Sequence, residues 1–193
     1  MEIRTPRPDE AEAVGEVIAG AFADGGHVAA LWAAVVAREL DRASLVAVDG
    51  DAVVGHVGVS HAWLDARREL VDVLILSPLS VRPERQGEGI GTALVAAAIE
   101  AARKLAAPAL FLEGSPAFYG RRGFGRARES GFEAPSRRTP EPAFQVVLLP
   151  GYADWMVGRV VYRDVWWEYD AAGLRDPELT EIERALEVES AQP

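Results

Sequence analysis

The sequence predicts an α/β fold in which helices flank a mixed central β-sheet. Consecutive strand-like runs rich in β-branched residues are followed by a strand–helix–strand order, which is typical of an α/β domain with a mixed sheet. The chain has 193 residues, of which 49% are hydrophobic and 26% are charged, as in ordinary globular proteins. A chain of this length can bury one sizeable core, so we expect a single domain over residues 1–193.

The N-terminal region predicts a short strand and two helices. Ile3–Arg4 fits a short strand. Residues 8–22 repeat apolar side chains at three- and four-residue steps, which indicates an amphipathic helix, and Pro8 with Asp9 supplies its start. A second helix is expected over residues 27–40.

Three strands are expected next. Two runs rich in β-branched residues, 43–49 and 52–64, are separated by Asp-Gly-Asp, and this turn sequence is typical of a hairpin. The third run, Leu70–Val81, is apolar on both faces, which predicts a central strand.

The pattern after a glycine-rich stretch predicts a helix, two more strands and a loop. The helix runs from about Ile90 to about Lys104 with its apolar residues on one stripe. Residues 108–114 predict another buried strand, and residues 144–150 predict a later one. Residues 125–142 are rich in turn formers and are expected to be a surface loop.

The last part of the chain predicts a C-terminal extension, residues 150–193. Its final segment, 177–193, has a helix-like register of apolar residues. The most distinctive motifs lie before it, within residues 70–125.

Composition excludes several classes of function. The formal net charge of −10 argues against nucleic-acid binding, although it could attract a cationic substrate such as an amine or simply keep the protein soluble. The absence of cysteine excludes disulfides and thiolate chemistry, and His27, His56 and His61 lack the spacing of a metal site, so no metal is expected. No apolar run is long enough to span a membrane and the N-terminus does not resemble a signal peptide, so we expect a cytoplasmic protein.

The stretch "VRPERQGEGIGTAL", residues 81–94, places three glycines between a strand pattern and a helix pattern. Such a turn can bind a phosphate group, because free N–H groups and the helix dipole converge there. A P-loop would need a lysine before Thr92, and a dinucleotide loop would need G-x-G-x-x-G opening a βαβ unit. Neither pattern fits Gly87, Gly89 and Gly91.

A different pattern does fit. Gln86, Gly89 and Gly91 match Gln/Arg-x-x-Gly-x-Gly/Ala, which resembles the acetyl-CoA signature of the GNAT superfamily of N-acetyltransferases. After a helix and a strand follows "GSPAFYGRRGF", in which Tyr119 and Phe124 belong to the Tyr-x-x-x-Gly-Phe sequence frequent in that family, and in particular in a bacterial subgroup of predicted N-acetyltransferases. Two motifs in this order make the resemblance specific.

The resemblance implies a splayed central sheet, acetyl-CoA as co-substrate and direct transfer of an acetyl group to an amine. Backbone amides of the glycine-rich loop would hold the pyrophosphate of coenzyme A, and Arg82 together with Arg85 would add positive charge. The backbone N–H of Leu79 or Val81 suits an oxyanion donor. The expected cofactor-binding residues are Leu79, Ser80, Val81, Arg82, Gln86, Gly87, Glu88, Gly89, Ile90, Gly91, Thr92 and Ser115.

Tyr119 is the expected catalytic residue, as the general acid that protonates the departing thiolate. The base is left open among Glu69, Asp72, Glu113, His56 and His61, with ordered water as a further route.

The acceptor is also left open. The expected partners are acetyl-CoA and an amine-bearing small molecule or peptide, without nucleic acid or membrane. A homodimer remains an option, because four tryptophans fit a substrate cleft, the core or a dimer surface: Trp63, Trp155, Trp166 and Trp167. The alternatives to an acetyltransferase are a catalytically silent CoA-sensing or protein-interaction module and an acyltransferase that uses a longer acyl-CoA.

Overall fold

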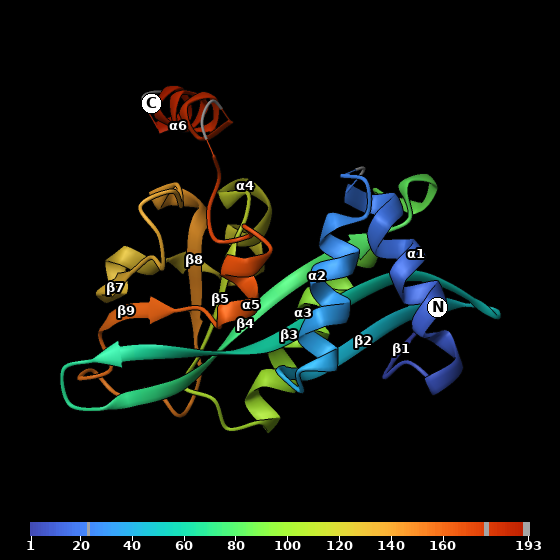
Figure 1. Ribbon diagram of the computed structural model, residues 1–193, viewed down its shortest axis with the longest axis horizontal. Helices are drawn as coiled ribbons and strands as arrows, with labels where there is room; N and C mark the ends of the chain where they lie inside the picture. The colour runs from blue at the N-terminus through green and yellow to red at the C-terminus, as the bar shows by residue number, and fades with distance from the viewer. Residues whose placement is uncertain (23, 176–177, 191–193) are drawn as a thin grey trace.

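A computed structural model describes residues 1–22, 24–175 and 178–190, and within these residues a nine-stranded mixed sheet runs through the molecule with helices on both faces (Figure 1). This confirms the predicted fold class. The strands are β1 (Glu2–Arg4), β2 (Asp41–Asp49), β3 (Ala52–Ala66), β4 (Leu70–Val81), β5 (Ala109–Glu113), β6 (Gly125–Arg126), β7 (Phe132–Glu133), β8 (Phe144–Leu148) and β9 (Gly158–Val161). The helices are α1 (Ala11–Phe22), α2 (His27–Ala37), α3 (Ile90–Lys104), α4 (Pro116–Tyr119), α5 (Asp164–Glu168) and α6 (Glu178–Ser190).

The first half of the sheet is antiparallel, in the order β1-β2-β3-β4. The predicted hairpin is confirmed, with Gly50 at a φ of 58° in its turn. The predicted central strand also has the observed limits of β4. Helix α2 ends three residues earlier than expected, because the chain turns at Glu39, which has a φ of 56°, to enter β2.

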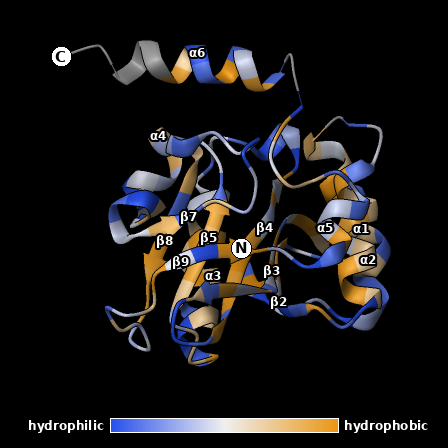
Figure 2. Ribbon diagram, turned by 60° about the vertical axis from the view of Figure 1, so that its left-hand side comes forward, coloured by the Kyte–Doolittle hydropathy of each residue, from blue (hydrophilic) through white to orange (hydrophobic). Residues whose placement is uncertain are grey.

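Two hydrophobic cores lie on opposite faces of the sheet. Side chains of α1 and α2 pack on one face, where Val46 and Val48 of β2 point. Side chains of α3 pack on the other face, together with Ala47 of the same strand. Figure 2 shows the apolar residues concentrated on the central strands and on the helices that cover them. This layering fixes the N-terminus of α3 beside the end of β4.

An irregularity in β4 shapes the middle of the sheet. Val57 pairs with Leu79 and Val59 pairs with Leu76, so two residues of β4, Ser77 and Pro78, stand opposite the single residue between them on β3. Such a bulge bends the strand that carries it. Pro78 in addition has no N–H with which to bond a neighbouring strand.

Beyond this bulge β4 leaves its parallel neighbour. The register of β4 with β5 covers only two pairs, Leu74 with Leu110 and Ile75 with Phe111. Strand β5 continues to Glu113 along β8, whereas β4 continues to Val81 along β3. The predicted splay of the central strands is therefore confirmed.

The C-terminal third differs from the sequence prediction in two places. The expected surface loop 125–142 contains two short strands, β6 and β7, because Phe132 is buried edge-on against Phe111, with the ring centroids 4.9 Å apart. Strand β9 and helix α5 were not expected, and β9 pairs with both β3 and β7. The helix expected in the tail is present as α6, and residues 176–177 and 191–193 of the extension lie outside the described residues.

In the described part of the chain, no helix is both long enough and apolar enough to cross a membrane.

A substitution at Gly58, the residue opposite the bulge, tests how closely β4 and Trp32 pack around this position. A Cβ at this position would lie 2.5 Å from the Trp32 ring and 2.8 Å from the carbonyl oxygen of Ser77. We expect Gly58→Ala to lower the free energy of unfolding by about 1–3 kcal/mol, because backbone on one side cannot yield. Gly15→Ala is the control, since no atom lies within 4 Å of its Cβ position in α1, and it should raise stability by up to about 1 kcal/mol. Urea unfolding measures both, and equal stability of the two variants would contradict the packing described for the bulge.

Candidate functional site

A cavity of about 510 Å³ lies where β4 ends and α3 begins. We call it the glycine-loop cavity. It is lined by Ala21, Phe22, Leu79, Val81, Arg85, Gln86, Gly87, Gly89, Ile90, Gly91, Thr92, Phe118 and Arg122. The glycine-rich loop, the end of β4 and the segment that begins at α4 thus meet around one space.

The glycines of the loop have distinct physical roles. Gly87 and Gly89 have φ values of 82° and 85°, a region that glycine enters without strain. Gly89 is the residue that caps α3, and no side chain bonds the helix end there. The N–H groups of the first turn of α3 have no partner within the helix, so they and the helix dipole favour an anion at this point.

Gly91 keeps the cavity open rather than forming the turn. A Cβ at this position would lie 3.5 Å from the Phe118 ring and 3.8 Å from Val81, both of which line the cavity. Any side chain on residue 91 would therefore project into the space that a ligand would use.

The free edge of β4 supplies a second set of backbone donors. The N–H of Arg82 donates to the carbonyl oxygen of Val54 on β3, at 3.0 Å. Because N–H groups alternate along an antiparallel strand, those of Leu79 and Val81 point to the opposite edge, which β5 has left. The carbonyl oxygen of Val81 faces the same side, where it accepts a hydrogen bond from Gln86 Nε2 at 3.3 Å.

Two arginines line the cavity, and one of them, Arg85, is paired with two carboxylates. Arg122 donates to the hydroxyl of Thr92 from Nε at 3.1 Å and from Nη2 at 2.5 Å, and its guanidinium lies 3.5 Å from the centroid of the Phe118 ring. Arg85 Nε donates to Glu88 at 2.9 Å, and Arg85 also pairs with Asp49. These contacts hold the guanidinium groups of Arg122 and Arg85 beside the glycine-loop cavity, although the protein as a whole has a net charge of −10.

Eight of the residues predicted to bind the cofactor line this cavity: Leu79, Val81, Gln86, Gly87, Gly89, Ile90, Gly91 and Thr92. Four do not. Arg82 turns away and donates from Nε to the carbonyl oxygen of Val53 at 2.8 Å. Ser80 is buried, and its hydroxyl has no hydrogen-bond partner among the described residues. Glu88 is exposed and bonded to an arginine, and Ser115 lines a different cavity, beside α6.

Tyr119, the predicted acid, lies at the end of α4 next to the glycine-loop cavity. Its ring is 4.8 Å from that of Phe118, which lines the cavity, and 5.8 Å from that of Phe124. Burial raises the pKa of Tyr119 to about 12, whereas the nearby Arg122 lowers it by a smaller amount. The phenol therefore remains protonated, and able to donate a proton, throughout the neutral range.

None of the five candidate bases lines the glycine-loop cavity. Burial lowers the pKa of His56 to about 3, and its Nε2 lies 3.0 Å from the hydroxyl of Ser44. His61 Nε2 lies 2.8 Å from Asp72. Glu113 ends β5, and burial raises its pKa to about 7.

Sequence analysis missed Phe118 and Arg122 as parts of the site, together with Ala21 and Phe22 at the end of α1. The cluster of arginines around the second motif was visible in the sequence. Only the structure shows that Arg122, one turn of chain after Phe118, faces the glycine loop.

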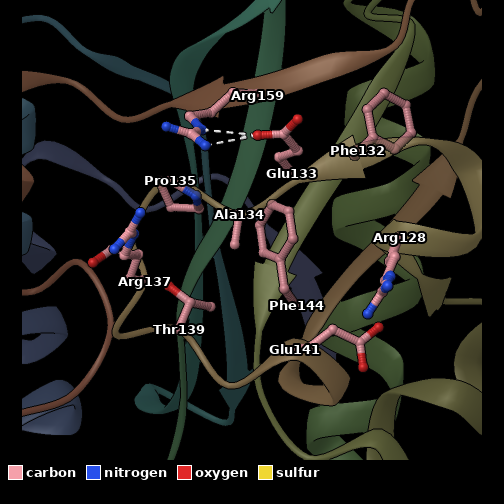
Figure 3. Close-up of a pocket in the computed structure, with 11 residues that line it drawn as sticks. Arg128, Phe132, Glu133, Ala134, Pro135, Arg137, Thr139, Glu141, Phe144 and Arg159 are labelled. Atoms are coloured by element: carbon pink, nitrogen blue, oxygen red, sulfur yellow. Dashed lines mark hydrogen bonds and ion pairs between the residues drawn. The ribbon is translucent and has the colours of Figure 1, made fainter.

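A separate cavity of about 280 Å³ lies between β7, β8 and residues 134–141 (Figure 3). Phe132 and Phe144 form its apolar wall, and Arg159 is bonded to Glu133 with Nη2 2.7 Å from Oε2. It contains no residue that the sequence predicted for the site.

Comparisons with known proteins agree with the geometry of the glycine-loop cavity. A family model described as "Acetyltransferase (GNAT) family" matches residues 16–124, more than half of the chain. The crystal structure of a GNAT family N-acetyltransferase (YhbS) from Escherichia coli in complex with CoA is 26% identical, covers 86% of this chain and 91% of its own, and has a TM-score of 0.76. A GNAT family acetyltransferase from Brucella melitensis, in complex with acetyl-CoA, is 27% identical, covers 86% of this chain and 97% of its own, and has a TM-score of 0.70.

A curated relative, the uncharacterized N-acetyltransferase YjhQ of Escherichia coli (strain K12), is 34% identical over 93 residues, or 48% of this chain. The match spans about half of that relative, 51% of its length. The family model covers both sequence motifs and the helix and strand between them, and the chain shares its fold with the two CoA-bound structures. The chain belongs to the GNAT acetyltransferase family.

Proposed function

We propose that the protein is an acetyl-CoA-dependent N-acetyltransferase that transfers the acetyl group directly to an amine. The observation that carries this proposal is the junction of two sets of free backbone N–H groups at one cavity: those of the first turn of α3 and those of the free edge of β4. A long molecule with phosphates at one end and a reactive carbonyl at the other suits this arrangement. The CoA and acetyl-CoA bound to the two similar crystal structures support it.

In this proposal the pyrophosphate of acetyl-CoA binds the loop from Gln86 to Thr92. The helix N-terminus attracts the negative charge, and Arg122 and Arg85 stand close enough to add to it. The pantetheine arm extends along the edge of β4 that β5 leaves unpaired, past Leu79 and Val81.

The chemistry follows from the same groups. The amine nitrogen attacks the thioester carbon, and the N–H of Leu79 or Val81 stabilises the negative charge on the carbonyl oxygen. The carbon–sulfur bond then breaks, and Tyr119 gives its proton to the thiolate. The amine loses one proton to a base or to water, so the products are an amide and the free thiol of CoA.

We also propose that residues 1–193 form one functional domain whose core motifs lie within 70–125. The extension 150–193 supports this, because its strand β9 joins the main sheet at Trp63–Ala66 of β3.

Gly91→Glu tests the cofactor site. A carboxylate at this position would stand in the cavity beside the proposed phosphates, and residue 91 lies within α3, where glutamate is well tolerated. We expect the Kd for acetyl-CoA, measured by calorimetry, to rise at least about tenfold, which corresponds to about 1.4 kcal/mol. Ala96→Glu adds the same charge on the exposed side of α3 and should leave the Kd unchanged. Equal affinities of the two variants would remove the glycine loop from the site.

Tyr119→Phe tests the acid. We expect kcat to fall about 100- to 10,000-fold while the Kd for acetyl-CoA stays the same, because only the proton donor is lost. Tyr152→Phe is the control, since Tyr152 packs on Phe132 away from the cavity and should keep its full rate. Because the pKa of Tyr119 is about 12, the wild-type rate should show no decline from this group as the pH rises to 10. Release of free thiol from acetyl-CoA measures the rates, and an unchanged kcat in Tyr119→Phe would exclude the role.

The same assay separates the enzyme from a silent CoA-binding module. Tight binding of acetyl-CoA without thiol release, over a panel of amines that includes small polar, apolar and peptide amines, would favour the module.

A further inference from the structure

A cavity of about 380 Å³ lies between the turn that begins α4 and the inner side of α6; we call it the α6 cavity. Figures 1 and 2 both place α6 beyond α4, at the outer edge of the molecule. Most of its wall is apolar, including Pro116, Pro140, Leu174 and Ile182. Glu113 is the one carboxylate among the described residues that line it.

The carboxyl group of Glu113 lacks a full set of partners. The hydroxyl of Tyr162 and the N–H of Gly173 donate hydrogen bonds to it and the hydroxyl of Thr139 lies beside it, but Oε1 is shielded from water without a hydrogen-bond partner among the described residues. The charge of Arg138 acts on this carboxyl group, but its Nη2 is bonded to Asp170 at 3.1 Å and its Nη1 is buried without a hydrogen-bond partner among the described residues. An ionised carboxyl group in such surroundings is costly until a cation pairs with it.

One side chain, that of Tyr119, packs between residues of the α6 cavity and residues of the glycine-loop cavity. Gly114, which lines the α6 cavity, has no side chain, and a Cβ there would overlap the ring of Tyr119. The same ring packs 4.8 Å from that of Phe118, which lines the glycine-loop cavity. The ring of Tyr119 is therefore in contact with residues that line each of the two cavities.

We propose that the α6 cavity is the acceptor site, and that it takes a small primary amine with an apolar body, whose ammonium group pairs with Glu113 and whose body contacts the two prolines and α6. This proposal rests on the proposed function. The ammonium group supplies the donor that Oε1 lacks. The net charge of −10 attracts a cation to the protein as a whole.

The preference for apolar amines is measured with two probes, 2-phenylethylamine and ethanolamine, at saturating acetyl-CoA. We expect kcat/KM to be at least about tenfold higher for 2-phenylethylamine, since burial of an aromatic group contributes more than this factor requires. Ile182→Asp places a charge on the apolar wall at a position that is 40% exposed, so the helix should tolerate it. This variant should lose the preference through a higher KM for 2-phenylethylamine, with KM for acetyl-CoA unchanged.

Arg184→Gln is the matched control, because it makes the same change of net charge on the exposed part of α6 and does not line the cavity. It should keep the wild-type preference.

The role of Glu113 is tested by binding rather than by activity. The Kd of 2-phenylethylamine is measured by calorimetry on protein saturated with CoA. Since the pKa of Glu113 is about 7, the ionised fraction falls about tenfold between pH 8 and pH 6, and the Kd should rise by about the same factor. In Glu113→Gln the Kd should be weak and independent of pH over this range.

The other groups that face Glu113 are the guanidinium of Arg138, the hydroxyl of Thr139, the N–H of Gly173 and the phenol of Tyr162. Burial raises the pKa of Tyr162 well above its usual value of 10, so this phenol stays neutral between pH 6 and 8. A purely structural role of Glu113 would give no such dependence of the Kd on pH.

Equal kcat/KM values for the two amines, or an unchanged preference in Ile182→Asp, would overturn the acceptor site. If acetyl-CoA binds and amines are acetylated without this preference, only the present inference fails. If acetyl-CoA does not bind, the proposed function fails with it.

Discussion

Two residues of β4, Ser77 and Pro78, stand opposite the single residue Gly58 of β3, and this mismatch directs the end of β4 away from β5. Gly58 has to be glycine for this packing, because the Trp32 ring occupies the place of a side chain. The packing of α2, the bulge in β4 and the absence of a side chain at Gly58 thus fix the gap between β4 and β5. The free edge of β4, the position of the glycine loop and the access to Tyr119 all depend on that gap.

The loop that follows β4 has a second constraint, which is electrostatic. The chain carries an excess of acidic residues, yet the mouth of the glycine-loop cavity combines a helix N-terminus with Arg122 and Arg85. The left-handed conformations of Gly87 and Gly89 bring the backbone amides to this point without side chains in the way. A local site for an anion is therefore built on a protein that as a whole repels anions.

Burial has opposite practical consequences at Tyr119 and Glu113, although it raises both pKa values. The phenol moves from its usual 10 to about 12 and remains a proton donor at every physiological pH. The carboxyl group moves to about 7, so its charge responds to small changes around neutrality and to a cation beside it. The two side chains are separated by Gly114 and the first turn of α4, which gives the two proposed substrates different chemical surroundings a short distance apart.

Much of the fold could be predicted from local sequence. The limits of β4, the hairpin at Gly50 and the helix from Ile90 to Lys104 were predicted because each element has its own periodicity and its own turn residues. Strands β6, β7 and β9 were missed because two to four residues are too few for a periodic signal. Their stability comes from contacts with distant strands, such as β9 with β3.

For the site, the sequence by itself determined which loop could approach a phosphate, since glycine adopts the conformations at positions 87 and 89 without strain and leaves the backbone accessible. It did not determine which arginine faces that loop. Arg82 and Arg122 are the same type of residue, and which of them faces the loop is decided by the hydrogen bond of Arg82 to Val53 and by the stacking of Arg122 on Phe118. Only the tertiary structure brought α6 over the end of β5, because that contact joins residues about 70 positions apart that share no local pattern.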